Sequence, residues 1–264
     1  MTEKTAVTRS IVDHGNASIE VLAQGRGPLV VMVPSLGRPA EDFDDLARRV
    51  ADAGYCALRP QPRGISASKG PMRGITLHDF AKDMAAVIEK HGGGPAVMAG
   101  HAFGNFVART TAADFPSRVK AVILLGATHV WPVPPDIRAS INKSHDMKLP
   151  EEERLRALKH AFFAPGNDPR VWLTGWREDV MHAEREATEA TPKEEWWHAG
   201  SAPILDVQPE SDVMTPPESR NRYRDEFGAN RVTTALVPGA GHALLPEQPE
   251  AVAKAVLDYL KGLK

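Results

Sequence analysis

The chain has 264 residues, of which 42% are hydrophobic and 25% are charged, as in folded globular domains rather than disordered segments. Its 32 basic residues are nearly balanced by 34 acidic ones and no long block of like charge occurs, so we expect no nucleic-acid partner, which would need a concentrated basic face. The N-terminal MTEKTAVTRS lacks a signal peptide's apolar stretch, and no apolar run approaches the ~18 residues of a membrane span, so we expect a cytoplasmic protein with no membrane partner.

Strand and helix patterns alternate along most of the chain. TRSIVD and ASIEVLAQG predict an antiparallel hairpin at a sheet edge. Apolar runs that lack polar alternation predict buried strands at residues 29–33, 55–58, 96–99, 119–125, 203–207 and 232–237. Helical patterns occur at about residues 40–53, 76–91, 104–114, 217–227 and 247–262. This order predicts an α/β fold with a mostly parallel central sheet and helices on both faces.

Residues 128–200 break this alternation and contain no convincing strand. PEEERLRALKHAFF predicts an amphipathic helix, with Glu151 to Glu153 in its first turn and Lys159 and His160 near its end, as the helix dipole favours. We therefore expect a helical cap at 128–200, inserted between core segments 1–127 and 201–264.

Tryptophan is concentrated in this expected cap. All five tryptophans lie in it or at its edge: Trp131, Trp172, Trp176, Trp196 and Trp197. They either supply the bulk that a small subdomain needs for its core or line an apolar ligand pocket between cap and sheet. Trp131, Trp172 and Trp176 are the candidates for the pocket.

The stretch VMAGHAFGNFVART, residues 97–110, has the frame of a catalytic turn but lacks the catalytic atom. In the G-x-S-x-G motif, a serine hydroxyl stands between two glycines on a sharp turn from strand to helix. Here Gly100 and Gly104 are present, and Ala102 occupies the serine position. A methyl group cannot attack a carbonyl, so the nucleophile has either been removed by engineering or been lost by natural divergence.

Six segments, in order, resemble the α/β-hydrolase superfamily over nearly the full chain. They are VPSLGRPAEDFDDLA, RPQPRGISAS, GHAFGNFVART, FPSRVKAVILLGA, PESDVMTP and PGAGHALLPEQPEAV. The resemblance implies the α/β-hydrolase fold, with a mostly parallel central sheet, helices on both faces and an inserted helical cap. It also implies esterase-like or lactonase-like chemistry without a cofactor.

The resemblance also assigns roles at a candidate site. His242 matches the catalytic histidine, which would act as the general base, and Asp212 matches the acid that orients it. Glu210 competes for the role of Asp212, because Pro209 replaces the glycine usual before this acid. The backbone amides of Leu36 and Phe103 would form the oxyanion hole.

Further departures from the family's pattern accompany Ala102. Pro34 and Ser35 replace the usual His-Gly pair before the oxyanion residue, and Gln61 replaces the usual aspartate of the Pro-Asp-x-x-Gly loop. Altered neighbours favour a naturally divergent branch, although they do not exclude an engineered alanine.

Other polar residues near the turn have two interpretations each. Ser35 either places its hydroxyl in the pocket, even as a displaced nucleophile, or braces its loop. His129 follows the sixth strand and is a candidate for the pocket floor, whereas His101 is expected to pack beneath the end of the sheet. No zinc-ligand spacing or dinucleotide fingerprint is present, so we expect no metal and no cofactor.

Two classes of function remain. The first is a cofactor-free enzyme that acts on small, apolar or aromatic esters or lactones through the Asp212 and His242 dyad, with a lyase-type reaction of the same base as a variant. The second is a pseudo-hydrolase that binds a ligand without turning it over. Either way, the partner is a small molecule. The oligomeric state stays open, with a homodimer as one option.

Overall fold

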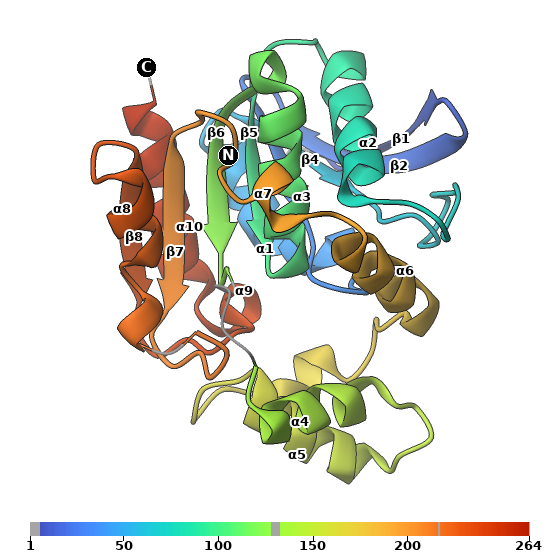
Figure 1. Cartoon of the computed structure of the whole chain (residues 1–264), viewed down its shortest axis with the longest axis vertical. Coiled ribbons are helices and arrows are strands. Elements are labelled where there is room, and N and C mark those ends of the chain that lie inside the picture. The colour runs from blue at the N-terminus through green and yellow to red at the C-terminus, as the bar shows by residue number, and fades with distance from the viewer. Residues whose placement is uncertain (1–5, 128–132, 216, 264) are drawn as a thin grey trace.

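The computed structural model describes residues 6–127, 133–215 and 217–263, in which eight strands form one sheet (Figure 1). The strand order is β1-β2-β4-β3-β5-β6-β7-β8. β1 and β2 form the antiparallel hairpin expected at the sheet edge, β2 pairs antiparallel with β4, and the remaining pairs are parallel. The strands are β1 (Thr8–His14), β2 (Ala17–Gly25), β3 (Leu29–Val33), β4 (Cys56–Pro60), β5 (Ala96–His101), β6 (Val119–Leu125), β7 (Ile204–Pro209) and β8 (Val232–Val237).

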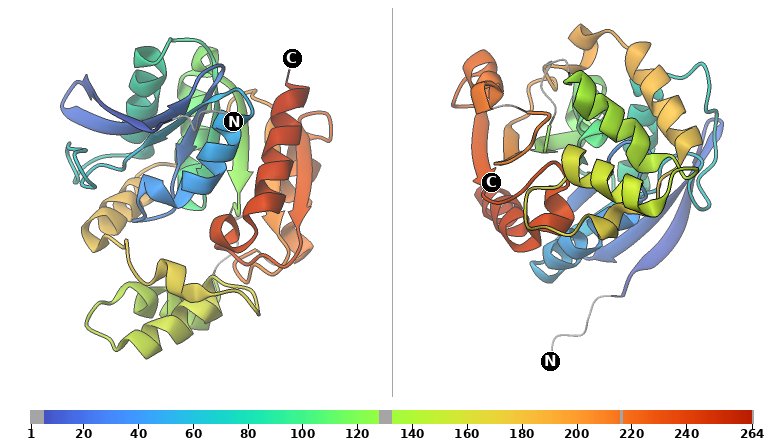
Figure 2. Two further views of the ribbon diagram at one scale, coloured as in Figure 1. Left: turned by 180° about the vertical axis from the view of Figure 1, so that it is seen from behind. Right: turned by 90° about the horizontal axis from the view of Figure 1, so that it is seen from below.

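Helices cover both faces of the sheet, as predicted. α1 (Asp44–Asp52) and α10 (Pro249–Gly262) lie on one face, which is turned toward the viewer in the left view of Figure 2. The opposite face carries α2 (Leu77–Lys90), α3 (Phe103–Asp114) and α8 (Arg222–Phe227). The predicted α/β architecture is therefore confirmed.

The lack of polar alternation in the strands follows from this double cover. In β3, Val31 and Val33 point into the core beneath α2 and α3, whereas Val30 and Met32 point into the core beneath α1 and α10. Because successive side chains of a strand point to opposite faces, a strand buried on both faces must be apolar throughout.

Two predicted helices differ from the structure at their boundaries: the one expected at 247–262 begins at Pro249, and the one expected at 217–227 is divided. Pro249 separates α9 (Leu244–Glu247) from α10, because proline lacks the N–H that would continue the helix. The pattern at 217–227 becomes η4 (Pro217–Ser219) and α8, with Asn221 in the capping position that asparagine favours. The remaining short helices are η1 (Ala40–Phe43), η2 (Pro116–Arg118) and η3 (Pro169–Trp172).

The segment between β6 and β7 contains only helices and loops where it is described, and its α4 and α5 part lies beyond the carboxyl ends of the central strands (Figure 1). It contains α4 (Pro135–His145), α5 (Glu151–Ala161), α6 (Glu178–Glu189) and α7 (Lys193–Trp196). α4 and α5 pack together around a small core that includes Ile137, Leu158 and Phe162. α6 contacts α2, and α7 contacts α3, so the later helices of the segment pack on the sheet domain.

Parallel strands bring their carboxyl ends to one edge, and this edge positions the candidate site. The loops after β3, β5, β7 and β8 carry Leu36, Ala102, Asp212 and His242, respectively. Ligands of open α/β sheets bind at this edge. No helix in the described part of the chain is long and apolar enough to cross a membrane.

Candidate active site

The turn after β5 has the strained geometry of a nucleophile elbow. Ala102 has φ 48° and ψ −110° and immediately precedes α3. A Cβ atom added at Gly100 would lie 2.2 Å from the Gly104 carbonyl oxygen, and one added at Gly104 would lie 2.1 Å from the Val33 oxygen. Both glycines are therefore required by close packing of backbone. A non-glycine residue at positive φ costs about 1–3 kcal/mol and persists only where its surroundings enforce it.

Polar groups on α3 brace this turn from behind. The Asn105 side chain donates to the Ala102 carbonyl oxygen, and the Arg109 guanidinium donates to the Asn105 side-chain oxygen. Arg109 is fully buried, and its guanidinium carbon lies 5.0 Å from the Trp196 ring centre and 4.7 Å from that of Trp197. Burial lowers the pKa of Arg109. These two tryptophans therefore surround a structural cation.

His242 and Asp212 form a buried pair at the same edge. His242 Nδ1 lies 2.9 Å from Asp212 Oδ2, and the other carboxylate oxygen of Asp212 accepts a hydrogen bond of 2.8 Å from the Met214 amide. Burial acts to raise the pKa of Asp212, but the charge and hydrogen bond of His242 and the Met214 amide hold it below its ordinary value. The competing Glu210 instead accepts from the Gly239 amide at 3.0 Å.

His101 supports the backbone of His242 and does not line the cavity. Its Nε2 lies 2.8 Å from the His242 carbonyl oxygen, and the residue is fully buried. Burial, reinforced by nearby His242, lowers the pKa of His101 to about 3. The neutral ring therefore donates Nε2–H to that carbonyl, in the packing role expected for it.

A cavity of 240 Å³ lies between the turn and the helices inserted between β6 and β7. It brings together most of the predicted site, and Asp212 contacts His242 from behind. Its volume is below the ~300–1,000 Å³ of sites for drug-sized ligands, so it suits a small molecule. Its lining consists of Ser35, Leu36, Ala102, Phe103, Phe106, Ile141, Phe162, Trp176, Met181, Arg185, Thr188, Glu189, Met214 and His242.

The tryptophans expected in the pocket occupy different places. Trp176 lines the cavity, with its Nε1 donating to the Trp172 carbonyl oxygen at 2.6 Å. Trp172 is 2% exposed and lies outside the lining, because it packs against Phe162 and Phe163 in the small core around α4 and α5. The candidates His129 and Trp131 lie outside the described residues.

The loop after β3 is held by α6 on both sides of Gly37. The Gly37 amide donates to Glu184 Oε2 at 2.6 Å, and the Gly37 carbonyl accepts from the Arg177 amide at 3.0 Å. A Cβ atom at Gly37 would lie 2.0 Å from Met181 Cγ, so glycine is needed here. Burial raises the pKa of Glu184 to about 8. Sequence reasoning did not single out Glu184, Met181 or Arg177.

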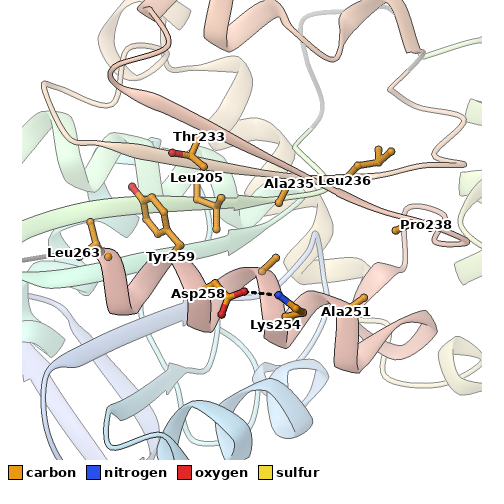
Figure 3. A pocket seen from close by; sticks show the side chains of 12 residues that line it. Leu205, Thr233, Ala235, Leu236, Pro238, Ala251, Lys254, Asp258, Tyr259 and Leu263 are labelled. Carbon is orange, nitrogen blue, oxygen red and sulfur yellow. Dashed lines mark hydrogen bonds and ion pairs between the residues drawn. The ribbon is translucent and has the colours of Figure 1, made fainter.

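A second, larger hollow lies away from these residues. It has a volume of 720 Å³ and runs between β8 and α10, where Leu236, Tyr259 and Leu263 line it (Figure 3). Its charged lining residues, Lys254 and Asp258, pair with each other at 2.6 Å. It contains no base held by a buried carboxylate, so the cavity beside Ala102 is the candidate active site.

The candidate site contains an imidazole held by a buried carboxylate, and Leu36 and Phe103 line the same cavity. Position 102 has no hydroxyl. Among the described residues, no group of three or more histidine, cysteine, aspartate or glutamate side chains is arranged to hold a metal ion. The arrangement can remove a proton from a water or a substrate that occupies the cavity.

Residues 30–255 match the profile of the family described as "Alpha/beta hydrolase family". The chain is similar to 2-(acetamidomethylene)succinate hydrolase of Mesorhizobium japonicum, with 24% identity over 94% of both chains. It is also similar to epoxide hydrolase A of Mycobacterium tuberculosis, with 23% identity over 98% of this chain and 99% of that one.

Solved structures show the same likeness. The crystal structure of E-2-(acetamidomethylene)succinate hydrolase matches with a TM-score of 0.78 and 19% identity, covering 97% of this chain and all of the other. A thermophilic esterase from Thermogutta terrifontis matches with a TM-score of 0.77 and 20% identity, covering 98% and 99% of the two chains. Likeness at these identities establishes the fold.

Proposed function

The chain belongs to the alpha/beta hydrolase family, and on this basis we propose that it hydrolyses small ester- or lactone-type substrates, with His242 as general base and without a cofactor. The observation that carries the proposal is the 2.9 Å contact between His242 Nδ1 and buried Asp212, at a cavity that also contains Ala102. A protein that only binds a ligand has no need of an oriented base.

The reaction proceeds by direct attack of water. Asp212 accepts the Nδ1–H hydrogen bond, which leaves His242 Nε2 free to take a proton from a water molecule. The water oxygen bonds to the substrate carbonyl carbon while the carbonyl oxygen becomes an oxyanion, which the amides of Leu36 and Phe103 stabilise. The tetrahedral intermediate then breaks the bond to the leaving-group oxygen, which receives the proton from His242. Ala102 forms no covalent intermediate.

The cavity lining supports an apolar or aromatic substrate body. Phe106, Phe162 and Trp176 present rings to the cavity, and Ile141 and Met181 add aliphatic surface. Burial of such surface gives affinity at roughly 25 cal/mol per Å² removed from water, before the costs of association are counted. The two curated relatives described above are both named as hydrolases, which supports hydrolysis as the reaction class.

A non-hydrolytic reaction of the same base is the second candidate, because position 102 carries no hydroxyl. In that reaction His242 would remove a proton from an acidic C–H or O–H group of the substrate. Product analysis separates the two candidates. Hydrolysis consumes water and releases an acid and an alcohol, whereas a lyase releases an unsaturated product.

The test compares the unmodified protein with its His242→Ala variant on a panel of phenyl esters and aromatic lactones. We expect kcat/KM to fall by about 10²–10⁴-fold in the variant, the usual contribution of a general base. Intact-protein mass spectrometry during turnover should show no acylated species. Equal activity of the two proteins, or an acyl group on the protein, would refute the proposed mechanism.

A further inference from the structure

Arg185 is unusual among the arginines of the described chain. It lies on α6, is partly buried and lines the cavity beside Ala102. Every other described arginine that is buried or partly buried donates to an oxygen or lies over an aromatic ring, as Arg38 does with Asp42 and Arg63 does with Asp83. Within the described ranges, Arg185 has no hydrogen bond, ion pair or ring contact. The guanidinium therefore has no protein acceptor among the described residues, and Arg185 is a lining residue of the cavity.

Arg185 has no hydrogen-bonded or ion-paired partner among the described residues, and Glu189 offsets its charge only at a distance. Burial lowers the pKa of Arg185, and Arg138 on α4 adds positive charge nearby. Glu189, one helical turn away, also lines the cavity, but its side chain is exposed and forms no ion pair with Arg185 in the structure described here. Most of the remaining lining is apolar. A partly buried charge beside such an apolar lining is stabilised when a bound group of opposite charge pairs with it.

We propose that Arg185 binds a carboxylate of the substrate, so that the substrate is a small ester or lactone with an apolar body and one anionic end. The planar guanidinium offers parallel N–H donors that match the two oxygens of a carboxylate. One arginine in a cavity of 240 Å³ suits a single carboxylate better than a phosphate, which usually takes several donors. That the reacting group is an ester or lactone rests on the proposed function.

The position of Arg185 relative to the reacting groups is fixed by its neighbour. Glu184 accepts the Gly37 amide hydrogen bond at 2.6 Å, and this bond attaches α6 to the loop that carries Leu36. The carboxylate subsite and the oxyanion hole are thus joined by one helix and one loop. The distance between this subsite and the oxyanion hole determines the distance between the carboxylate and the scissile carbonyl in a substrate that fits.

The experiment measures binding alone, with benzoate and benzamide as an isosteric anionic and neutral pair. Isothermal titration calorimetry is run on the unmodified protein and on Arg185→Met, Arg185→Lys, Arg138→Met and Glu189→Gln. We expect benzoate to bind the unmodified protein about tenfold or more tightly than benzamide, as charge-assisted hydrogen bonds provide. Arg185→Met should abolish this preference. The variant should bind benzamide as tightly as the unmodified protein does, because methionine keeps an apolar stem at this position.

The other variants distinguish a seated carboxylate from general attraction. Arg185→Lys should keep only part of the preference, because lysine lacks the bidentate fork. Glu189→Gln should tighten benzoate binding, and exposed Arg138→Met should leave the preference within about twofold. The proposal is overturned if benzoate shows no preference, if neither probe binds, or if Arg138→Met acts like Arg185→Met. Because binding needs no turnover, inactivity of the protein on esters would count against the proposed function alone.

Discussion

The Glu184 carboxyl group and the Gly37 amide are joined by a 2.6 Å hydrogen bond between helix α6 and the loop after β3. Glu184 lies 147 positions after Gly37 in the chain. Through this hydrogen bond, α6 contacts the loop in which we expect the oxyanion hole. The contact makes the positions of α6 and the loop interdependent. It also buries a carboxyl group that has no cationic partner in the described structure.

Glu184 should make stability depend on pH. Its pKa is raised from 4.5 to about 8 in the folded protein, so the folded state holds a proton that the unfolded state releases. The contribution is fully present below about pH 4.5 and is lost as pH rises toward 8. We expect the free energy of unfolding in urea to fall over this range more steeply for the unmodified protein than for Glu184→Gln. Parallel pH profiles would show that Glu184 does not titrate in this way.

Ala102→Ser should create a serine hydrolase if the surrounding groups are in register. The hydroxyl would stand on the elbow beside His242, with the Phe103 and Leu36 amides ready for the oxyanion. We expect a gain of orders of magnitude on p-nitrophenyl acetate or butyrate, since loss of the nucleophile in serine hydrolases costs about a million-fold.

Two controls interpret that gain. Ala102→Gly relieves the positive φ without adding a nucleophile, so it should bring no burst of p-nitrophenol. Adding His242→Ala to Ala102→Ser should abolish the increase. A folded Ala102→Ser protein with no increase would mean that the loop containing Pro34 and Ser35 is misaligned for an oxyanion.

Arg109→Met should destabilise the fold although Arg109 lies outside the cavity lining. The guanidinium sits within 5.0 Å of the ring centres of Trp196, Trp197 and Tyr223, and it holds Asn105 against the turn. We expect a loss of roughly 3 kcal/mol in unfolding free energy, as for a broken buried polar network. Arg222→Met is the matched control.

Arg222 also lies over Trp197, at 5.9 Å, but it is only partly buried. Its replacement should change stability by about 0.5 kcal/mol or less. Similar losses in both variants would show that the buried network adds nothing beyond ordinary cation and ring contacts.

Replacing Trp172 and Trp176 one at a time should distinguish a structural tryptophan from one that contacts the substrate. Trp172→Ala removes a 2% exposed ring from the small core around α4 and α5 and should cost about 3–5 kcal/mol of stability. Trp176→Ala should cost less stability and raise KM for aromatic esters relative to aliphatic ones, because Trp176 lines the cavity. Thermal unfolding and steady-state kinetics on both ester types check this. A change of ester preference only in the Trp172 variant would reverse the assignment.

The sheet and the turn could be predicted because local sequence dictates them. Strands buried on both faces must be apolar throughout, and the glycines at 100 and 104 are required by backbone contacts shorter than any side chain tolerates. The Asp212 and His242 pair followed from chain order and motif resemblance. The structure was needed to decide whether Asp212 or Glu210 is the partner of His242. Both acids follow β7 within three positions, and only the shape of the turn determines which one faces the imidazole.

Glu184, Arg185 and Arg109 could not be predicted from the sequence. Each lies on a helix, where periodicity indicates the buried face but not the neighbour that covers it. The Gly37 partner of Glu184 comes from another part of the chain, and the rings around Arg109 come from α7 and α8. Trp172 and Trp176 are one helical turn apart in sequence, yet only one lines the cavity. Long-range packing decides such contacts.

A double-mutant cycle on kcat/KM tests the central claim most directly. It compares the unmodified protein with Asp212→Asn, His242→Ala and the double variant, on the ester that the unmodified protein hydrolyses fastest. Because Asp212 acts only by orienting His242, each single change should cost about 10²-fold or more, and the double variant should be no less active than His242→Ala. Independent, additive losses, or an unmodified protein no more active than its His242→Ala variant, would contradict general-base hydrolysis by this pair.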